Sequence, residues 1–181
     1  MQKEIEVKIQ VSDLKPIQEK LESLGCVISN PIAQHDTIFN LNGITINDHK
    51  TPVLRIREQN GKYIFTFKQD VTNELDCIEH ETEITNKDEL VKIIERLNFV
   101  KTVEVRKTRR KTQYGEYEIC LDDVDNLGLF VEAQKMSEQD GKIVQDELID
   151  FLVELGVPRE GVVSRGYDTL VFEKLHQKES L

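Results

Sequence analysis

The stretch that decides the fold is Lys3-Glu4-Ile5-Glu6-Val7-Lys8-Ile9-Gln10, near the start of the chain. Polar and apolar residues alternate along it without a break, and its apolar residues are all β-branched. A period of two predicts a β-strand with one charged face and one apolar face. Such a strand can lie at a sheet edge with its charged face in water. It can also belong to a closed sheet whose interior carries the charge.

The same alternation recurs along the chain, and Asn60-Gly61 is a strong hairpin signal. Further strands are expected at residues 34–40, 53–57, 62–68, 79–84, 103–111, 116–124 and 129–136. Apolar residues at helical spacing predict helices at 13–24, 86–97 and 139–155. Gly141 is unfavourable inside a helix, so we expect the third helix to begin near Lys142.

Composition restricts the class of protein. The chain has 181 residues and a formal charge of −10, which suits one domain over residues 1–181 and argues against a nucleic-acid partner. It contains neither a basic-then-apolar leader nor an apolar run of about 20 residues, so we expect a cytoplasmic protein with no membrane partner. The three cysteines are widely spaced, which predicts free thiols and no zinc site.

Charged residues of both signs share the polar faces of the predicted strands, and the opposite faces are mostly apolar. This mixture favours a closed sheet in which the apolar faces pack against outer helices and the charges line a tunnel. Basic side chains in such a tunnel need an anion, and acidic ones need a cation. A polyphosphate with Mg²⁺ or Mn²⁺ meets both needs.

Several blocks, in order, resemble the CYTH or triphosphate tunnel metalloenzyme family, and most closely its class IV adenylyl cyclases. The first is the Glu4-Ile5-Glu6-Val7-Lys8 motif. The following blocks are Gln34–Asn40, Leu54–Arg57, Thr66–Lys68, Glu81–Glu83, Val105–Arg109, Leu121–Val124 and Leu127–Glu132. The resemblance implies an α+β fold built on a closed antiparallel eight-stranded β-barrel, a tunnel with a charged lumen and helices packed outside. It also suggests a homodimer.

The resemblance further implies roles for individual residues. The catalytic residues would be Glu4, Glu6, Lys8 and Arg57. The triphosphate would be bound by Lys8, Arg55, Arg57, Lys68, Lys107 and Arg109. The metal ligands would be Glu4, Glu6, Glu81, Glu83, Asp122 and Glu132, although Glu81, Glu83 and Asp122 could instead orient the cations.

Two positions depart from the family pattern. Gln134 stands where many relatives have a second glutamate, which removes one possible metal ligand. Arg165-Gly166 separates Ser164 from Tyr167, and this puts in doubt any role for that pair.

The function expected from the resemblance is conversion of ATP to cyclic AMP and pyrophosphate, with Mg²⁺ or Mn²⁺. The alternative is a triphosphatase that hydrolyses inorganic triphosphate or thiamine triphosphate at the same charged site. A third hypothesis is a module that binds polyphosphate or nucleotide without catalysis. The residues by themselves do not separate the first two.

Overall fold

The computed structural model describes residues 2–44, 46 and 51–177. Its strands are β1 (Lys3–Val11), β2 (Ile32–Leu41), β3 (Val53–Gln59), β4 (Lys62–Asn73), β5 (Asp76–Ile84), β6 (Phe99–Tyr114), β7 (Tyr117–Val124), β8 (Gly128–Ser137) and β9 (Val162–Val163). Its α-helices are α1 (Lys15–Ser23), α2 (Lys87–Arg96), α3 (Gly141–Glu154) and α4 (Tyr167–Gln177), with a 3-10 turn at Arg159–Gly161.

One sheet contains all of these strands. They follow the order β5-β4-β3-β2-β6-β7-β8-β1-β9, and β5 also pairs with β1, so the sheet closes. This confirms the predicted α+β fold with eight long strands, to which the two-residue β9 is added. The chain forms two compact units, residues 1–32 with 107–164 (unit 1) and residues 33–106 with 165–181 (unit 2).

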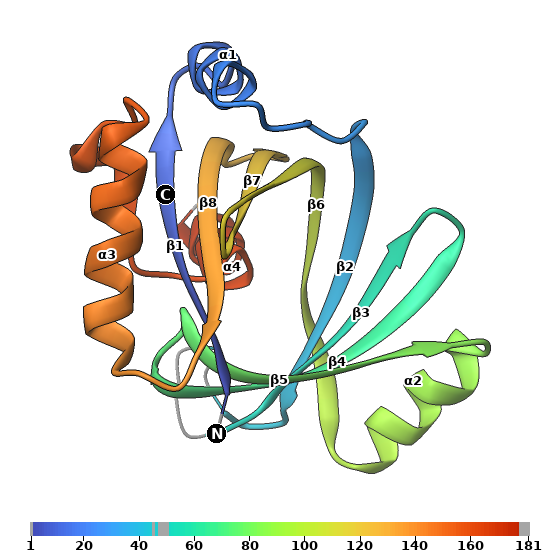
Figure 1. Cartoon of the computed structure of the whole chain (residues 1–181). Coiled ribbons are helices and arrows are strands. Elements are labelled where there is room, and N and C mark those ends of the chain that lie inside the picture. The colour runs from blue at the N-terminus through green and yellow to red at the C-terminus, as the bar shows by residue number, and fades with distance from the viewer. Residues whose placement is uncertain (1, 45, 47–50, 178–181) are drawn as a thin grey trace. The chain divides into compact units, whose positions relative to one another are not determined.

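Unit 1 has its core on the apolar face of β1, where Ile5, Val7 and Ile9 are buried. Apolar residues of β7, β8, α1 and α3 complete this core, and α3 runs alongside β1 and β8 (Figure 1). Strand β1 pairs antiparallel with β8, placing Lys8 opposite Glu132. The apolar half of the opening alternation is therefore the part that binds the sheet to its helices.

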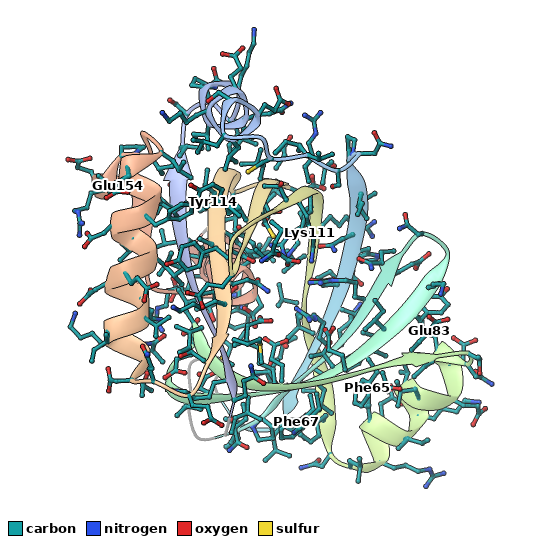
Figure 2. All side chains as sticks on the ribbon, in the orientation of Figure 1. Phe65, Phe67, Glu83, Lys111, Tyr114 and Glu154 are labelled. Carbon is teal, nitrogen blue, oxygen red and sulfur yellow. The ribbon has the colours of Figure 1, made fainter. Side chains whose placement is uncertain are left out.

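Unit 2 repeats this arrangement with other elements. Strands β2 to β5 pair antiparallel in chain order, and α2 packs Ile94 against Leu54 and Ile56. Phe65 and Phe67 on β4 contact the same cluster while remaining half-buried (Figure 2). The capping signal before α2 is real, because the Asn86 side chain accepts a hydrogen bond from the Glu89 N–H at 3.1 Å.

Strands β4 and β5 extend beyond their expected ranges, to Asn73 and from Asp76, because these added residues pair with each other. Three other elements also differ from expectation. Strand β6 is longer than predicted, since Phe99 at its start packs into the unit 2 core. Helix α3 begins at Gly141 and not at Lys142, because Asp140 caps it by accepting from the N–H groups of Lys142 and Ile143. The segment after Tyr167, which lacks a clear sequence pattern, forms α4.

Candidate functional site

The middle of the polar face of β1 is buried. Glu6 is 6% exposed and Lys8 is 3% exposed, so the strand is not an edge strand with its charges in water. In unit 1 the strand register places these side chains beside the charged residues of β6, β7 and β8. This group, called the unit 1 cluster below, comprises Glu4, Glu6, Lys8, Lys107, Arg109, Asp122 and Glu132.

Arg109 is the centre of the unit 1 cluster. Its Nε and Nη2 donate to the two carboxylate oxygens of Asp122, directly opposite on β7, at 2.7 and 2.5 Å. The same Nη2 donates to Glu132 Oε2 at 2.9 Å. A two-pronged bond to one carboxylate fixes the plane of the guanidinium, and therefore the direction in which its remaining N–H groups point.

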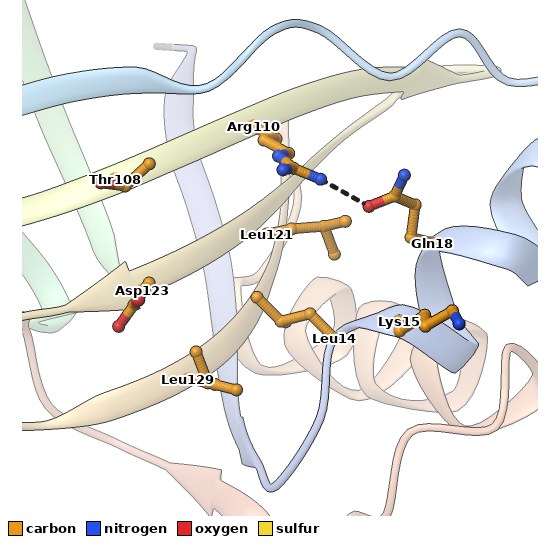
Figure 3. A pocket seen from close by; sticks show the side chains of 8 residues that line it. All are labelled: Leu14, Lys15, Gln18, Thr108, Arg110, Leu121, Asp123 and Leu129. Carbon is orange, nitrogen blue, oxygen red and sulfur yellow. Dashed lines mark hydrogen bonds between the residues drawn. The ribbon is translucent and has the colours of Figure 1, made fainter.

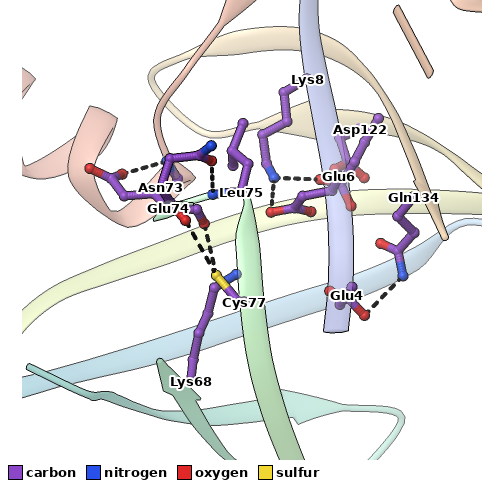
Figure 4. Close-up of polar contacts among 12 residues, drawn as sticks. Glu4, Glu6, Lys8, Lys68, Asn73, Glu74, Leu75, Cys77, Asp122 and Gln134 are labelled. Atoms are coloured by element: carbon purple, nitrogen blue, oxygen red, sulfur yellow. Dashed lines mark hydrogen bonds and ion pairs between the residues drawn. The ribbon is translucent and has the colours of Figure 1, made fainter. Parts of the chain in front are cut away.

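Lys8 links two carboxylates. Its ammonium lies 2.5 Å from Glu6 Oε1 and 3.2 Å from Glu132 Oε2 (Figure 4). Burial would raise the pKa of Glu132, but the charges of Arg109, Lys8 and Lys107 outweigh it and hold the pKa well below its usual range. Burial likewise opposes the charge of Arg109, but Glu132 and Asp122 raise its pKa. Glu132 and Arg109 therefore both stay charged at neutral pH.

The unit 1 cluster becomes more exposed along the strands. Gln134 Nε2 donates to Glu4 Oε2 at 3.2 Å, so the amide that replaces a family glutamate contacts a proposed metal ligand (Figure 4). Beyond it, Lys111 pairs with Glu118 at 2.7 Å, and both side chains are about one-third exposed. Lys111 belongs to this charged face, although sequence reasoning gave it no role (Figure 2).

Unit 2 carries a second group, the unit 2 cluster, made of Asp36, Arg55, Arg57, Thr66, Lys68, Glu79 and Glu81. Arg57 donates from Nε and Nη2 to both oxygens of Asp36, each at 2.7 Å. Asp36 stands opposite Arg57 in the β2–β3 register and is buried. The arginine–aspartate geometry of unit 1 thus recurs in unit 2 on different strands.

The other cations of the unit 2 cluster share Glu79. Lys68 Nζ lies 2.9 Å from Glu79 Oε1, and Arg55 Nη2 lies 3.6 Å from Glu79 Oε2. Burial would raise the pKa of Glu79, but the charges of Lys68, Arg55 and Arg57 lower it to about 2. Arg55 also donates to Glu81 Oε1 at 2.8 Å, and Thr66 donates to the same oxygen at 2.8 Å.

Glu83 lies apart from the unit 2 cluster. It pairs with Lys62 at 2.8 Å, and both side chains are more than half exposed (Figure 2). Asp36 and Thr66, by contrast, join the cluster although sequence reasoning gave them no role. The sequence does place Asp36 on the same face of its strand as Gln34 and Ile38. Its pairing with Arg57 could be recognised only once the register of β2 against β3 was known.

The segment around Tyr167 has a structural explanation. Arg165 Nη1 lies 2.7 Å from Glu74 Oε1, and the Gly166 N–H donates to Glu74 Oε2 at 2.8 Å. A Cβ at position 166 would collide with the Asp168 carboxylate, so a larger residue there would require that side chain to shift. The two residues that separate Ser164 from Tyr167 therefore bind the buried Glu74 and lead into α4.

The donor chemistry of the unit 1 cluster fits a hard divalent ion. Within residues 2–44, 46 and 51–177, no three His, Cys, Asp or Glu side chains are already grouped as metal ligands. The carboxylates of Glu6 and Glu132 nevertheless both contact the Lys8 ammonium, so a positive charge is already favoured between them. Carboxylate oxygens are the ligands that Mg²⁺ and Mn²⁺ prefer.

None of the helices in the described part of the chain is long and apolar enough to cross a membrane.

The chain matches the model of the CYTH domain family over residues 2–167. A Methanocaldococcus jannaschii protein named "putative adenylate cyclase" is 29% identical over 171 residues, which cover 91% of this chain and 95% of that protein.

Two solved structures are also similar. The PH1819 protein of Pyrococcus horikoshii is 26% identical with a TM-score of 0.78, and the match covers 94% of this chain and 99% of that one. A Hippeastrum protein, described as a "putative adenylyl cyclase" with a dominant triphosphatase activity, is 18% identical with a TM-score of 0.60 over 96% of each chain. By its match over residues 2–167, the chain belongs to the CYTH domain family.

Proposed function

We propose that this protein is a divalent-metal-dependent enzyme that converts ATP to cyclic AMP and pyrophosphate. The observation that carries the proposal is the unit 1 cluster, in which carboxylates and cations are buried together, in a chain of the CYTH family. The relative named as an adenylate cyclase supports this reaction, since the match covers almost the whole of both chains. CYTH proteins are generally metal-dependent, and Mg²⁺ or Mn²⁺ would suit these carboxylates.

In this proposal the cations bind the phosphates. Arg57 and Arg109 are each held by an aspartate through Nε and Nη2, which leaves Nη1 to donate to phosphate oxygens. Lys8, Arg55, Lys68 and Lys107 would add further positive charge. Fixed donors aimed at the β- and γ-phosphates stabilise the negative charge that develops on the departing pyrophosphate.

Carboxylates Glu4, Glu6 and Glu132, with Asp122 and Glu81 as further candidates, would hold the metal. When bound, the ion would lower the pKa of the attacking hydroxyl and stabilise charge on the phosphates. The ribose 3′-oxygen would form the new bond to the α-phosphorus, the hydroxyl proton would pass to water, and the bond from that phosphorus to the pyrophosphate oxygen would break. Glu83 is proposed only as a peripheral ligand, because it pairs with Lys62 at the surface.

Hydrolysis of a triphosphate is the second candidate. The cations of both clusters suit phosphate oxygens, which ATP and inorganic triphosphate both have. The clusters would therefore bind inorganic triphosphate equally well. The Hippeastrum protein is described as having a dominant triphosphatase activity, although its 18% identity to this chain carries the fold only. In this reaction water would attack the terminal phosphorus.

The free thiols Cys26, Cys77 and Cys120 suit the reducing cytoplasm as the location of the protein.

The deciding experiment incubates the protein with ATP, inorganic triphosphate or thiamine triphosphate, each with Mg²⁺ and with Mn²⁺. Products are separated by chromatography and ³¹P NMR. Cyclic AMP with pyrophosphate supports the cyclase, whereas orthophosphate from any substrate supports the hydrolase. Calorimetric binding of triphosphate without turnover of any substrate would contradict both and leave a binding module.

Matched variants locate the activity. Lys8→Ala and Arg57→Ala should lower kcat/KM by at least about 100-fold, because each removes a charged donor to the phosphates. The controls are Lys62→Ala and Arg106→Ala, whose side chains are exposed cations paired at the surface. Equal losses in site and control variants would remove the two clusters from the site.

A further inference from the structure

Unit 1 has a cavity of about 410 Å³ on the face of its sheet opposite the unit 1 cluster. Strands alternate their side chains, so Thr108 and Arg110 point away from Lys107 and Arg109, and Asp123 points away from Asp122. The start of α1 forms the other wall (Figure 3). A volume of this size suits a small organic molecule.

The floor of the cavity is apolar. Leu14 at the start of α1, Leu121 on β7 and Leu129 on β8 face one another across it (Figure 3). Leu121 is buried in the unit 1 core, whereas Leu14 and Leu129 are half-buried. A ligand body that covers these leucines would remove apolar surface from water, which is favourable.

Arg110 lies beside this floor with an unusual partner. Its side chain is half-buried, and its Nη1 donates to the neutral amide oxygen of Gln18 at 2.8 Å (Figure 3). No carboxylate among the described residues forms an ion pair with it, whereas Arg57, Arg109 and Arg165 each contact at least one. A partly desolvated guanidinium next to apolar surface is stabilised by an anion.

The surroundings also favour an anion near Arg110. Lys15 lines the same wall, and its ammonium has only a long contact of 3.8 Å with the exposed Glu19. The N-terminus of α1 already has an acidic partner, because the Lys15 N–H donates to Asp13 Oδ1 at 2.9 Å, so the positive charge at this end comes from the side chains of Arg110 and Lys15. Asp123 and Thr108 lie at the far end of the cavity from Gln18 (Figure 3). The cavity is therefore polarised, with a cationic end, an apolar floor and an acidic end.

We propose that this cavity binds a small amphipathic carboxylate. The carboxylate would accept hydrogen bonds from Arg110, and the aliphatic body would lie on Leu14, Leu121 and Leu129. Because the cavity uses the opposite sheet face, this site is separate from the unit 1 cluster, and the proposal holds or fails independently of the proposed function. Inorganic phosphate would use only the charged end, so the leucines favour an organic anion.

The test is a titration followed by ¹H–¹⁵N and methyl NMR of the full chain, with octanoate as the probe. The two controls each lack one feature: 1-octanol has the chain without the charge, and acetate has the charge without the chain. We expect saturable shifts centred on Leu14, Arg110, Leu121 and Leu129, with octanoate bound at least about tenfold more tightly than either control. One charge-assisted hydrogen bond accounts for this difference from octanol, and burial of two or more CH₂ groups accounts for it from acetate.

Variants assign the binding to Arg110. Arg110→Gln should weaken octanoate binding at least about tenfold, and Arg110→Lys should restore part of it. Arg106→Gln, an exposed arginine on the same strand outside the cavity, should bind as the parent does. The dispersion of the NMR spectrum reports whether each variant is folded. Non-saturable shifts, equal binding of octanol, or an equal effect of Arg106→Gln would overturn the proposal.

Discussion

Glu132 could act either as a metal ligand or as a structural partner of buried cations. It contacts Lys8 and Arg109. Burial would raise its pKa, but the positive charges around it lower the pKa further than burial raises it. A structural partner of two cations and a metal ligand would both be ionised and buried. The two roles therefore differ only in what happens when the charge is removed.

Glu132→Gln should raise the metal concentration for half-maximal activity sharply, because an amide is a poorer ligand than a carboxylate. Stability should fall by less than the ~3–5 kcal/mol typical of a broken buried pair, since Arg109 keeps Asp122 and Lys8 keeps Glu6. Metal titration of activity and urea unfolding without metal measure the two effects. An unchanged metal titration with a lowered unfolding midpoint would limit Glu132 to a structural role. Glu116→Gln, at an exposed position, is the control.

Glu79→Gln should change how stability depends on pH. The pKa of Glu79 is lowered from 4.5 to about 2, so its contribution is complete above pH 4.5 and is lost as pH falls toward 2. This shift corresponds to about 3 kcal/mol of unfolding free energy. Urea unfolding of parent and variant should differ by this amount at pH 6 and converge near pH 2. The control Glu83→Gln, at an exposed position paired with Lys62, should change stability by less than about 0.5 kcal/mol. A pH-independent difference for Glu79→Gln would contradict the assignment.

At the scale of elements, the apolar faces of the strands bind the helices. Strand β4 presents Phe65 and Phe67 to the cluster that contains Ile94 of α2. Both phenylalanines remain half-buried, in contrast to Ile56 on β3, which is fully buried. Alternation predicted which face packs, whereas how deeply each side chain is buried depends on where α2 crosses the sheet.

Phe65→Ala should lower the free energy of unfolding by about 2 kcal/mol, which is less than the ~3–5 kcal/mol expected for a fully buried phenylalanine. The partly exposed ring leaves a smaller cavity when it is removed. Ile93→Ala, on the exposed side of α2, should change stability by less than about 0.5 kcal/mol. Both are measured by urea unfolding at pH 7. A loss for Phe65→Ala as small as that for Ile93→Ala would show that β4 does not depend on this packing.

For the whole molecule, most of the charge in each cluster is compensated within that cluster. The unit 1 cluster has four carboxylates and three cations, and the unit 2 cluster has three of each. Among the carboxylates proposed to hold metal, Glu132 contacts Lys8 and Arg109, and Glu81 contacts Arg55. Removing a metal would therefore leave little uncompensated negative charge. The homodimer suggested by family likeness and the assignment of residues 1–181 to one domain stay predictions.

Chelation should abolish activity and leave the fold in place. After treatment with EDTA and desalting, we expect turnover to disappear and to return with Mg²⁺ or Mn²⁺. The thermal midpoint should change little without added ion, because Lys8 and Arg109 already contact Glu6, Asp122 and Glu132. Full turnover in the chelated protein would contradict the metal requirement. Loss of the circular dichroism of the folded state on chelation would contradict the charge balance.

The sequence alone determined which residues share a strand face. Alternation in residues 3–10 places Glu4, Glu6 and Lys8 together because the side-chain period of a strand is two, whatever the strand packs against. Mixed charges on those faces predicted a closed sheet, and the described strands close. Free cysteines and the cap of α2 also follow from local patterns.

Only the tertiary structure decided which charges meet. Arg57 contacts Asp36 on β2, although Glu83 lies in the same row of the sheet across Ile64. That choice depends on the register of β2 against β3 and on the direction of the guanidinium, which no local pattern encodes. The register of a strand pair is set by contacts between strands that can be distant in the sequence. Local patterns therefore identify the charged residues, whereas their pairing depends on the folded chain.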